Sequence, residues 1–526
     1  MAIGTIASRG TGFVRNASIA AVLGVTGVGA AYNVANTTPN IVYELLLGGI
    51  LTSVLVPLLV RAAKDDEDGG QAYAQQLLTL VVVVLLSASV ILVLLAPQLV
   101  DLYAANAAPD DRDLAVVLAR FFLPQMLFYG AGAVLGAILN TRGRFGPPMW
   151  APVLNNLVVI ATCGLFLTLP GTSPLRSGSI SDTQLLVLGI GTTLGIALQT
   201  VALVPSLRAV GFSFRPRWGL RDVGGIGRLA TWVLLYVVAN QVAYVIVVRL
   251  ANDDALNAAG RGYASYVNAF VLWQLPHAVV AVSVITALLP RMSRAAADDR
   301  LDDLRAQLNR GLRLTVVVLI PAAIGYIVLG RVLATVVFGH LRTTDEQARF
   351  IGVIVAVFAV GLVPFSLYQL QLRAFYALQD TRTPTLINLG VNVTLVVVDV
   401  ALYVALPDRY EVLGLAAGHA CSFVAGLLIC SRVLSRRIGG LDGGPVIRTA
   451  VRCLTAALPA GGVAAVVVAL VVRLLGDGQV GSLTGLLTGS AVLGAVYLAL
   501  GRRMRIAELD EVTGPVLARL GRRGGP

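Results

Sequence analysis

Charged residues are scarce in this sequence, and lysine is almost absent. Only 13% of the 526 residues are Asp, Glu, Lys or Arg, whereas soluble domains carry about 25%. Lys64 is the only lysine, and the residues before it lack the glycines that precede the lysine of a phosphate-binding loop. The composition therefore excludes a water-soluble globular enzyme, and the sequence has no ATPase motif of this type.

Cysteine and histidine are also rare, with four and three residues in the whole chain. No CxxC pair, HExxH motif or GxSxG motif occurs, and no His, Cys, Asp or Glu cluster has the spacing of metal ligands. We therefore expect no enzyme activity, no cofactor and no firmly bound metal. Energy for any transport would come from an ion gradient, the membrane potential, the substrate gradient or a partner.

Apolar residues dominate what is present: 57% are hydrophobic, and the mean hydropathy is +0.81. A membrane-spanning helix needs about 20 predominantly apolar residues. Apolar stretches bounded by charge, proline and glycine predict an all-α polytopic membrane protein with about fourteen transmembrane helices. The stretches are 4–24, 31–60, 73–100, 114–140, 148–169, 184–206, 223–248, 263–290, 311–337, 350–378, 385–405, 412–431, 449–472 and 482–500.

The basic residues indicate how these helices are oriented. The formal net charge is +12, but in a membrane protein basic loops mark the cytoplasmic side rather than a nucleic-acid partner. With both termini inside, the inner loops hold 24 basic residues and the outer loops hold 8. We therefore predict a multi-pass protein of the cytoplasmic membrane with cytoplasmic N- and C-termini, in contact with membrane lipids.

The sequence also contains an internal repeat. Residues 137–147 resemble 374–384 at an offset of 237, which also relates Asn155 to Asn392 and Pro39 to Pro276. The offset spans six helices, so two similarly oriented six-helix lobes are predicted, with a substrate site between them near the membrane midplane. The predicted parts are an N-terminal lobe (1–212), a C-terminal lobe (213–437), helices 13 and 14 (438–505) and a basic cytoplasmic tail (506–526).

Polar residues in the first span form one face of a helix. Arg9, Arg15 and Asn16 share this face with Ser8, Thr11, Gly12 and Ser18. Since polar groups within a span must face water or protein, and guanidinium groups bind phosphate oxygens well, the face predicts an anion site in a cavity. The alternative is an interfacial helix whose arginines reach the lipid headgroups.

Two further helices carry polar stripes. In the second span Asn36, Asn40 and Glu44 follow one another at helical spacing, interrupted by Pro39, and we expect them to line the substrate site. The alternative for Glu44 is a protonated carboxyl in a helix–helix hydrogen bond.

In the eleventh span, the carboxylate and amide oxygens of Asn388, Asn392 and Asp399 suit a cation or proton site, with Asn240 and Gln241 of the seventh span as possible partners. The alternative is polar contact between helices.

The chain resembles the MurJ/MviN lipid II flippases, which belong to the MOP exporter superfamily. The matching motifs are Ser8-Arg9-Gly10-Thr11-Gly12-Phe13-Val14-Arg15, Pro39-Asn40, Ile138-Leu139-Asn140-Thr141, Leu275-Pro276, Leu288-Leu289-Pro290, Ala374-Phe375-Tyr376-Ala377 and Thr383-Pro384. One departure is that Tyr43 and Glu44 occupy a region where members often carry arginine.

The resemblance implies two lobes around a central cavity and alternating access. It further implies that the chain flips undecaprenyl-diphosphate-linked peptidoglycan precursor, with Arg9 and Arg15 near the diphosphate, and that a sodium or proton site includes Asn388, Asn392 and Asp399. Cell-wall synthesis proteins are possible partners. The alternatives are a related exporter of another lipid-linked sugar or amphiphile, and a non-transporting scaffold for cell-wall synthesis.

Overall fold

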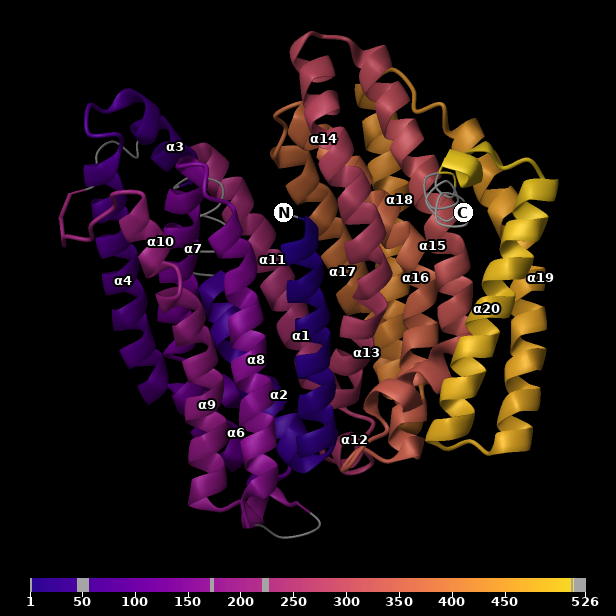
Figure 1. Ribbon diagram of the computed structural model, residues 1–526, viewed down its shortest axis with the longest axis horizontal. Helices are drawn as coiled ribbons and strands as arrows, with labels where there is room; N and C mark the ends of the chain where they lie inside the picture. Colours follow the sequence, from indigo (N-terminus) through magenta and orange to yellow (C-terminus); the bar gives the residue numbers. More distant parts are fainter. Residues whose placement is uncertain (1, 45–55, 171–174, 220–226, 512–513, 515–526) are drawn as a thin grey trace, which may run out of the picture. The chain divides into compact units, whose positions relative to one another are not determined.

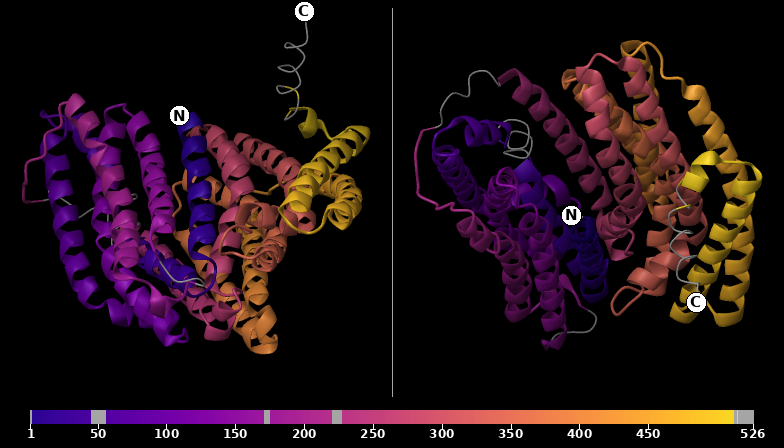
Figure 2. Two further views of the ribbon diagram at one scale, coloured as in Figure 1. Left: turned by 60° about the horizontal axis from the view of Figure 1, so that its bottom comes forward. Right: turned by 45° about the horizontal axis from the view of Figure 1, so that its top comes forward.

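The computed structural model describes residues 2–44, 56–170, 175–219, 227–511 and 514. These residues form helices joined by short loops, with no β-strand among them. The chain divides into two compact units. Unit 1 comprises Met1–Ala264 and Leu341–Thr343, and unit 2 comprises Ser265–His340 and Thr344–Pro526. Figures 1 and 2 show the helices of each unit.

Unit 1 contains the first group of helices. They are α1 (Ala2–Leu23), α2 (Gly27–Tyr43), α3 (Val56–Asp65), α4 (Gln71–Leu94), α5 (Ala96–Ala104), α6 (Pro109–Phe122), α7 (Gln125–Thr141), α8 (Gly146–Thr168), η3 (Ser177–Ser179), α9 (Asp182–Val201), α10 (Val204–Ala209), α11 (Gly227–Ala251) and α12 (Asp254–Ala258). Helix α8 packs against α1 and α9, and α2 packs against α6.

Unit 2 contains the second group, beginning with α13, whose first two residues belong to unit 1. They are α13 (Tyr263–Pro276), η4 (His277–Ala281), α14 (Val282–Ala297), α15 (Leu301–Phe338), α16 (Asp345–Ala377), α17 (Arg382–Ala405), η5 (Asp408–Tyr410), α18 (Glu411–Arg437), α19 (Gly443–Leu475) and α20 (Gln479–Arg503). Helices α19 and α20 lie side by side at one edge of this unit and pack on α15.

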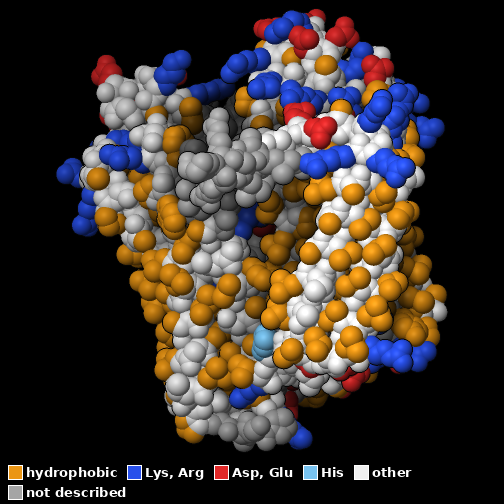
Figure 3. Space-filling model, turned by 45° about the vertical axis from the view of Figure 1, so that its right-hand side comes forward, with side chains coloured by type: hydrophobic (Ala, Val, Ile, Leu, Met, Phe, Trp, Pro, Cys, Tyr) orange, Lys and Arg blue, Asp and Glu red, His pale blue; other side chains and the backbone are white. Residues whose placement is uncertain are grey.

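The predicted membrane-spanning stretches correspond to helices. Among the described residues, twelve helical segments are long and apolar enough to cross a membrane. Helices α1 and α2 also fall on predicted stretches, but α1 carries many polar residues and α2 has only 17 described residues. Every one of the fourteen stretches contains a helix, so the all-α polytopic fold is confirmed. On the face shown in Figure 3, hydrophobic side chains cover the middle of the helices, and charged side chains gather at the ends.

The two units repeat one local helix plan. Helix α8 packs against α9 in unit 1 as α17 packs against α18 in unit 2. Helices α7 and α16 also end alike: the Arg144 amide donates to Leu139 O (2.8 Å), and the Asp380 amide donates to Phe375 O (3.0 Å). Both ends use a residue with positive φ, Gly143 in one and Gln379 in the other, as the Schellman motif requires. This similarity supports the internal repeat.

The compact units divide the chain differently from the lobes that the repeat predicts. Helix α11 contacts α5 and belongs to unit 1, so the division falls after Ala264 instead of after residue 212. The repeat concerns the order of helices along the chain, whereas the units reflect which helices touch. The lobes at 1–212 and 213–437 therefore stay a prediction.

Candidate functional site

Helix α1 presents the arginine that organises the candidate site. Arg15 lies in the second half of α1, is half-buried, and donates from Nε and Nη2 to Asn16 Oδ1 at 3.3 and 3.1 Å. It forms no salt bridge with an acid in the described part of the chain. The guanidinium thus keeps its positive charge without a protein counter-ion.

A polar contact holds α1 against α8. Asn156 Nδ2 donates to Ser8 O at 3.1 Å and to Thr11 Oγ1 at 3.0 Å. Gly12 faces the same side chain, since a Cβ there would lie in contact with Asn156 Nδ2, at 3.4 Å. These contacts fix the rotation of α1, so its polar face meets α8 and the cavity beyond it.

Arg15 lines a polar cavity inside unit 1 with a volume of about 250 Å³. The cavity is surrounded by α1, α2, α7, α8 and α9. Its other lining residues are Ile19, Tyr32, Asn36, Asn40, Gln125, Tyr129, Asn155, Val159, Thr192, Ile196 and Gln199. We call it the Arg15 cavity. Arg15 lies near enough to Tyr32 and Tyr129 to interact with them electrostatically.

Two buried amide oxygens in this cavity have no hydrogen-bond partner. They are Gln125 Oε1 on α7 and Asn155 Oδ1 on α8, and both side chains are at least 95% buried. Gln125 Nε2 donates to Thr193 Oγ1 at 3.1 Å, which leaves its oxygen as the free group. Because unpaired buried acceptors are costly, these oxygens are positioned to accept from a donor inside the cavity, such as a hydroxyl group or water.

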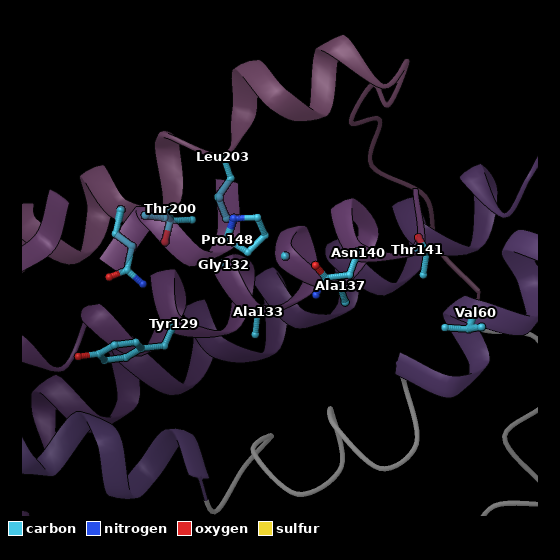
Figure 4. A pocket seen from close by; sticks show the side chains of 13 residues that line it. Val60, Tyr129, Gly132, Ala133, Ala137, Asn140, Thr141, Pro148, Thr200 and Leu203 are labelled. Atoms are coloured by element: carbon cyan, nitrogen blue, oxygen red, sulfur yellow. The ribbon is translucent and has the colours of Figure 1, made fainter. Parts of the chain in front are cut away.

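A second, larger cavity adjoins the first. It has a volume of about 630 Å³ and shares Tyr129 and Gln199 with the Arg15 cavity. Small and apolar residues make up much of its wall, including Gly132, Ala133 and Ala137 (Figure 4), and none of the described residues that line it is charged. A polar cavity beside an apolar one suits a ligand with a polar and an apolar part.

The structure brings together some of the predicted substrate-site residues. Asn36 and Asn40 of α2 join Arg15 at the cavity. Asn16 contacts the site only through its hydrogen bond to Arg15. Arg9 and Glu44 are exposed and do not line this cavity.

Sequence reasoning missed Gln125, Tyr129 and Thr192 as lining residues. Nothing in the sequence distinguishes these residues from other polar groups in spans. Asn155 did have a signal, because the repeat offset relates it to Asn392, yet it was not predicted to line the site.

The predicted coupling residues fall in both units. Asn240 and Gln241 are in α11 of unit 1, whereas Asn388, Asn392 and Asp399 are in α17 of unit 2. Asn392 Nδ2 donates to Asn388 O at 3.0 Å. Asp399 lies seven residues beyond Asn392, about 10 Å along the helix. The role of these residues in coupling stays a prediction.

Asp399 has an unusual environment. Its side chain is completely buried, and neither oxygen has a hydrogen-bond partner. Gly418 of α18 faces it so closely that a Cβ there would lie 1.8 Å from Asp399 Oδ1. The glycine thus makes the space that the carboxyl occupies.

An aromatic cluster fills the neighbouring interior of unit 2, and sequence reasoning did not predict it. Trp273 is fully buried, and its ring stacks on Phe358 and Phe423 with centroids 5.5 and 5.8 Å apart. The other members are Tyr266, Phe270, His277, Phe365 and His419. His419 Nδ1 lies 3.0 Å from Tyr266 Oη, so this histidine is held by the cluster.

Comparison with known proteins identifies the family. The family model described as "Lipid II flippase MurJ" matches residues 19–486, which is most of the chain. This chain belongs to the MurJ family. The match covers the helices of the Arg15 cavity from Ile19 onward and extends into α20.

Several MurJ relatives match over most of their length. The probable lipid II flippase MurJ of Haemophilus influenzae is 27% identical over 451 residues, covering 81% of this chain and 83% of the relative. The lipid II flippase MurJ of Burkholderia cenocepacia is 27% identical over 411 residues, covering 77% and 76%. The chain is therefore a member of a family of membrane transporters.

Solved structures show the same fold. A lipid II flippase MurJ in an inward closed conformation matches with a TM-score of 0.74 and 18% identity, covering 96% of this chain and 99% of that one. An inward-facing multidrug resistance MATE family transporter of the MOP superfamily matches with a TM-score of 0.67 and 15% identity, covering 82% and 95%. The MurJ and MOP-superfamily fold predicted from sequence is thus confirmed.

Proposed function

We propose that this chain flips lipid II, the undecaprenyl-diphosphate-linked peptidoglycan precursor, across the cytoplasmic membrane by alternating access, with both termini in the cytoplasm. The MurJ family match and the MurJ relatives support this substrate. The predominance of basic residues in the predicted inner loops supports the orientation.

The observation that carries the proposal concerns Arg15. This arginine lies within a helix, lines a cavity and forms no salt bridge with any acid that the structure describes. A guanidinium group forms paired hydrogen bonds with phosphate oxygens. Asn36 and Asn40 add amide donors, while Gln125 and Asn155 offer the free oxygens that sugar hydroxyls need. This set of groups matches a phosphate linked to a sugar.

The size of the cavity limits what it holds. At about 250 Å³ it lies below the ~300–1,000 Å³ of drug-sized ligand sites. It therefore accommodates a phosphate or a single sugar ring and not the complete disaccharide-pentapeptide. The adjoining apolar cavity of about 630 Å³ continues from it through Tyr129 and Gln199, and we assign an apolar part of the substrate to that space.

The test replaces Arg15 in a strain depleted of its own lipid II flippase and measures lipid II exposed on the outer leaflet. Arg15→Ala should reduce exposure by about 10- to 100-fold, the effect of losing charge-assisted hydrogen bonds of ~1.5–3 kcal/mol. Arg15→Lys should fall between this variant and wild type, because it keeps the charge but loses the planar fork.

Arg144→Ala is the matched control, because Arg144 is exposed in the same unit and does not line the cavity. It should transport at the wild-type rate. Full rescue by Arg15→Ala, at equal protein levels in the membrane, would remove Arg15 from the mechanism.

We also propose that Asp399 couples transport to a proton or sodium gradient. A fully buried carboxylate without a donor is costly to keep charged, so it binds a proton or a cation. Binding and release of that ion would change the relative free energies of the inward-facing and outward-facing conformations, and so bias the transport cycle. Transport by the purified protein in vesicles, with a pH gradient or a sodium gradient imposed separately, identifies the ion; independence from both gradients would refute the coupling role.

A further inference from the structure

A basic pocket lies in unit 2, at the end where α16 and α18 finish and α17 begins. Its volume is about 540 Å³. It is lined by Phe375, Asp380, Arg382, Thr383, Leu386, Val433, Arg436 and Arg437. We call it the Arg436 pocket. It belongs to a different unit from the Arg15 cavity, and the proposed transport function assigns it no role.

Positive charge predominates in this pocket. Three arginines line it against one acid, Asp380. Arg436 and Arg437 form no salt bridge with any acid that the structure describes. The Asp380 carboxylate is occupied locally, since its oxygens accept from Thr383 N at 3.0 Å and Thr383 Oγ1 at 2.6 Å. The pocket therefore retains unneutralised guanidinium groups.

The start of α17 adds to this charge. Arg382 and Thr383 are the first two residues of a 24-residue helix, and the N-terminus of a helix carries a partial positive charge. The pocket thus combines arginine side chains with a favourable helix end, which is a common arrangement for binding phosphate.

The fold does not require these charges, as the repeat-related positions in unit 1 show. At the repeat offset of 237, Arg436 and Arg437 correspond to Gln199 and Thr200, two uncharged residues that line the 630 Å³ cavity. The charge in the Arg436 pocket is a property of these side chains and not of the helix packing.

The wall of the Arg436 pocket is apolar on one side. Leu386 is 47% exposed, Val433 is half-buried, and Phe375 closes the pocket from within. A free phosphate ion would leave this surface in water, whereas a lipid would cover it. The residues lie in or beside loops 379–384 and 432–448, which the arginine distribution predicts to be cytoplasmic, and that leaflet carries anionic lipids.

We propose that the Arg436 pocket binds the phosphate headgroup of an anionic glycerophospholipid. Arg436 and Arg437 hold the phosphate oxygens, and the glycerol and the first acyl carbons lie against Leu386 and Val433. The site would tie this end of α16, α17 and α18 to the anionic leaflet.

The experiment measures lipid retention by the full-length protein. The protein is placed in nanodiscs of phosphatidylcholine with increasing phosphatidylglycerol, then transferred to neutral detergent, and the bound phosphatidylglycerol is counted by native mass spectrometry. Wild type should retain phosphatidylglycerol in preference to phosphatidylcholine. The double variant Arg436→Gln/Arg437→Gln should bind it about 25-fold more weakly, at roughly fivefold for each arginine near a lipid phosphate.

The matched control is Arg502→Gln/Arg503→Gln. These exposed arginines lie at the end of α20 and do not line the pocket. Their replacement removes the same amount of charge as the double variant of the pocket. The control should bind like wild type. Should the double variant fail to fold, as judged by thermal unfolding in phosphatidylcholine alone, Arg437→Gln should still show the fivefold loss.

Three results would overturn the proposal. Equal losses in both double variants would indicate a general surface attraction. Unchanged retention in the pocket variants would exclude the pocket as the binding site. Displacement of the lipid by millimolar inorganic phosphate, with phosphate binding in its absence, would show a free-anion site instead of a lipid site.

Discussion

The two units share a local helix plan but place their charged groups in different positions. Unit 1 has Arg15 inside its helix bundle, facing a polar cavity, and leaves the pocket beside α7 and α8 uncharged. Unit 2 packs aromatic rings around Trp273 and has Arg436 and Arg437, which pair with no acid that the structure describes, in the pocket beside α17. The repeat thus determines how helices pack, while individual side chains determine what each unit can bind.

Among the described residues, this contrast appears as a polar cavity in unit 1 and a packed aromatic cluster in unit 2. In unit 1, Asn36, Asn40 and Tyr129 line the Arg15 cavity. In unit 2, Trp273 is fully buried among Phe358, Phe423 and other rings. The difference can be tested by removing comparable groups from both units.

The largest expected effect is on stability, when an aromatic ring is removed from each unit. Trp273→Ala should lower the free energy of unfolding by about 3–5 kcal/mol, because it leaves a void in a filled core. Tyr129→Ala should cost less than about 2 kcal/mol, since Tyr129 is half-buried and already borders two cavities. Thermal unfolding in detergent measures both variants, and equal losses would contradict the difference between the interiors.

A smaller effect is expected from changing the buried acid of unit 2. Asp399→Asn has nearly the same shape and should keep thermal stability within about 1 kcal/mol of wild type, since no partner is lost. It should reduce gradient-driven transport by roughly tenfold, equivalent to ~1.4 kcal/mol. Measuring both thermal stability and gradient-driven transport separates a coupling role from a structural one. If the variant loses stability but responds to the gradient as wild type does, Asp399 has a structural role and not a coupling role.

The smallest effect concerns an arginine that both units use alike. Arg112 of α6 and Arg349 of α16 are separated by the repeat offset of 237, and each forms a salt bridge with an acid. Arg112 pairs with Asp101, and its Nη2 atom lies 2.9 Å from Asp101 Oδ2. Arg349 pairs with Asp477. The hydrogen bond from Arg112 lowers the pKa of Asp101 below its usual value. Asp101 lies at the end of α5, outside the candidate spans.

Because the folded-state pKa of Asp101 is lowered, the stability it contributes is present above the unfolded-state pKa of about 3.9. That contribution is lost as the pH falls through the folded value. Asp101→Asn should therefore slightly reduce thermal stability at neutral pH and remove this part of the acid sensitivity. The pair is solvent-exposed, so its contribution is small. A variant as acid-sensitive as wild type would show that the pair contributes nothing measurable.

A small part of the candidate site could be predicted, and only one side chain at a time. Arg15, Asn36 and Asn40 were predicted because each lies on a polar face within an apolar stretch, and such groups need a wet or polar environment. Gln125 and Tyr129 were missed because a single polar residue in a span has no pattern. Arg9 was predicted together with Arg15 from the same helix face, yet six residues along the helix separate the two, about 9 Å, and Arg9 is exposed.

The sequence by itself determined which apolar stretches form helices, and which helix carries Arg15, because hydropathy and helical period are local properties of the chain. Only the tertiary structure decided that Gln125 and Asn155 share a cavity with Arg15, that Gly418 makes space for Asp399, and that Arg436 and Arg437 line a pocket together with the start of α17. These features depend on which helix faces meet, and distant parts of the chain determine that together.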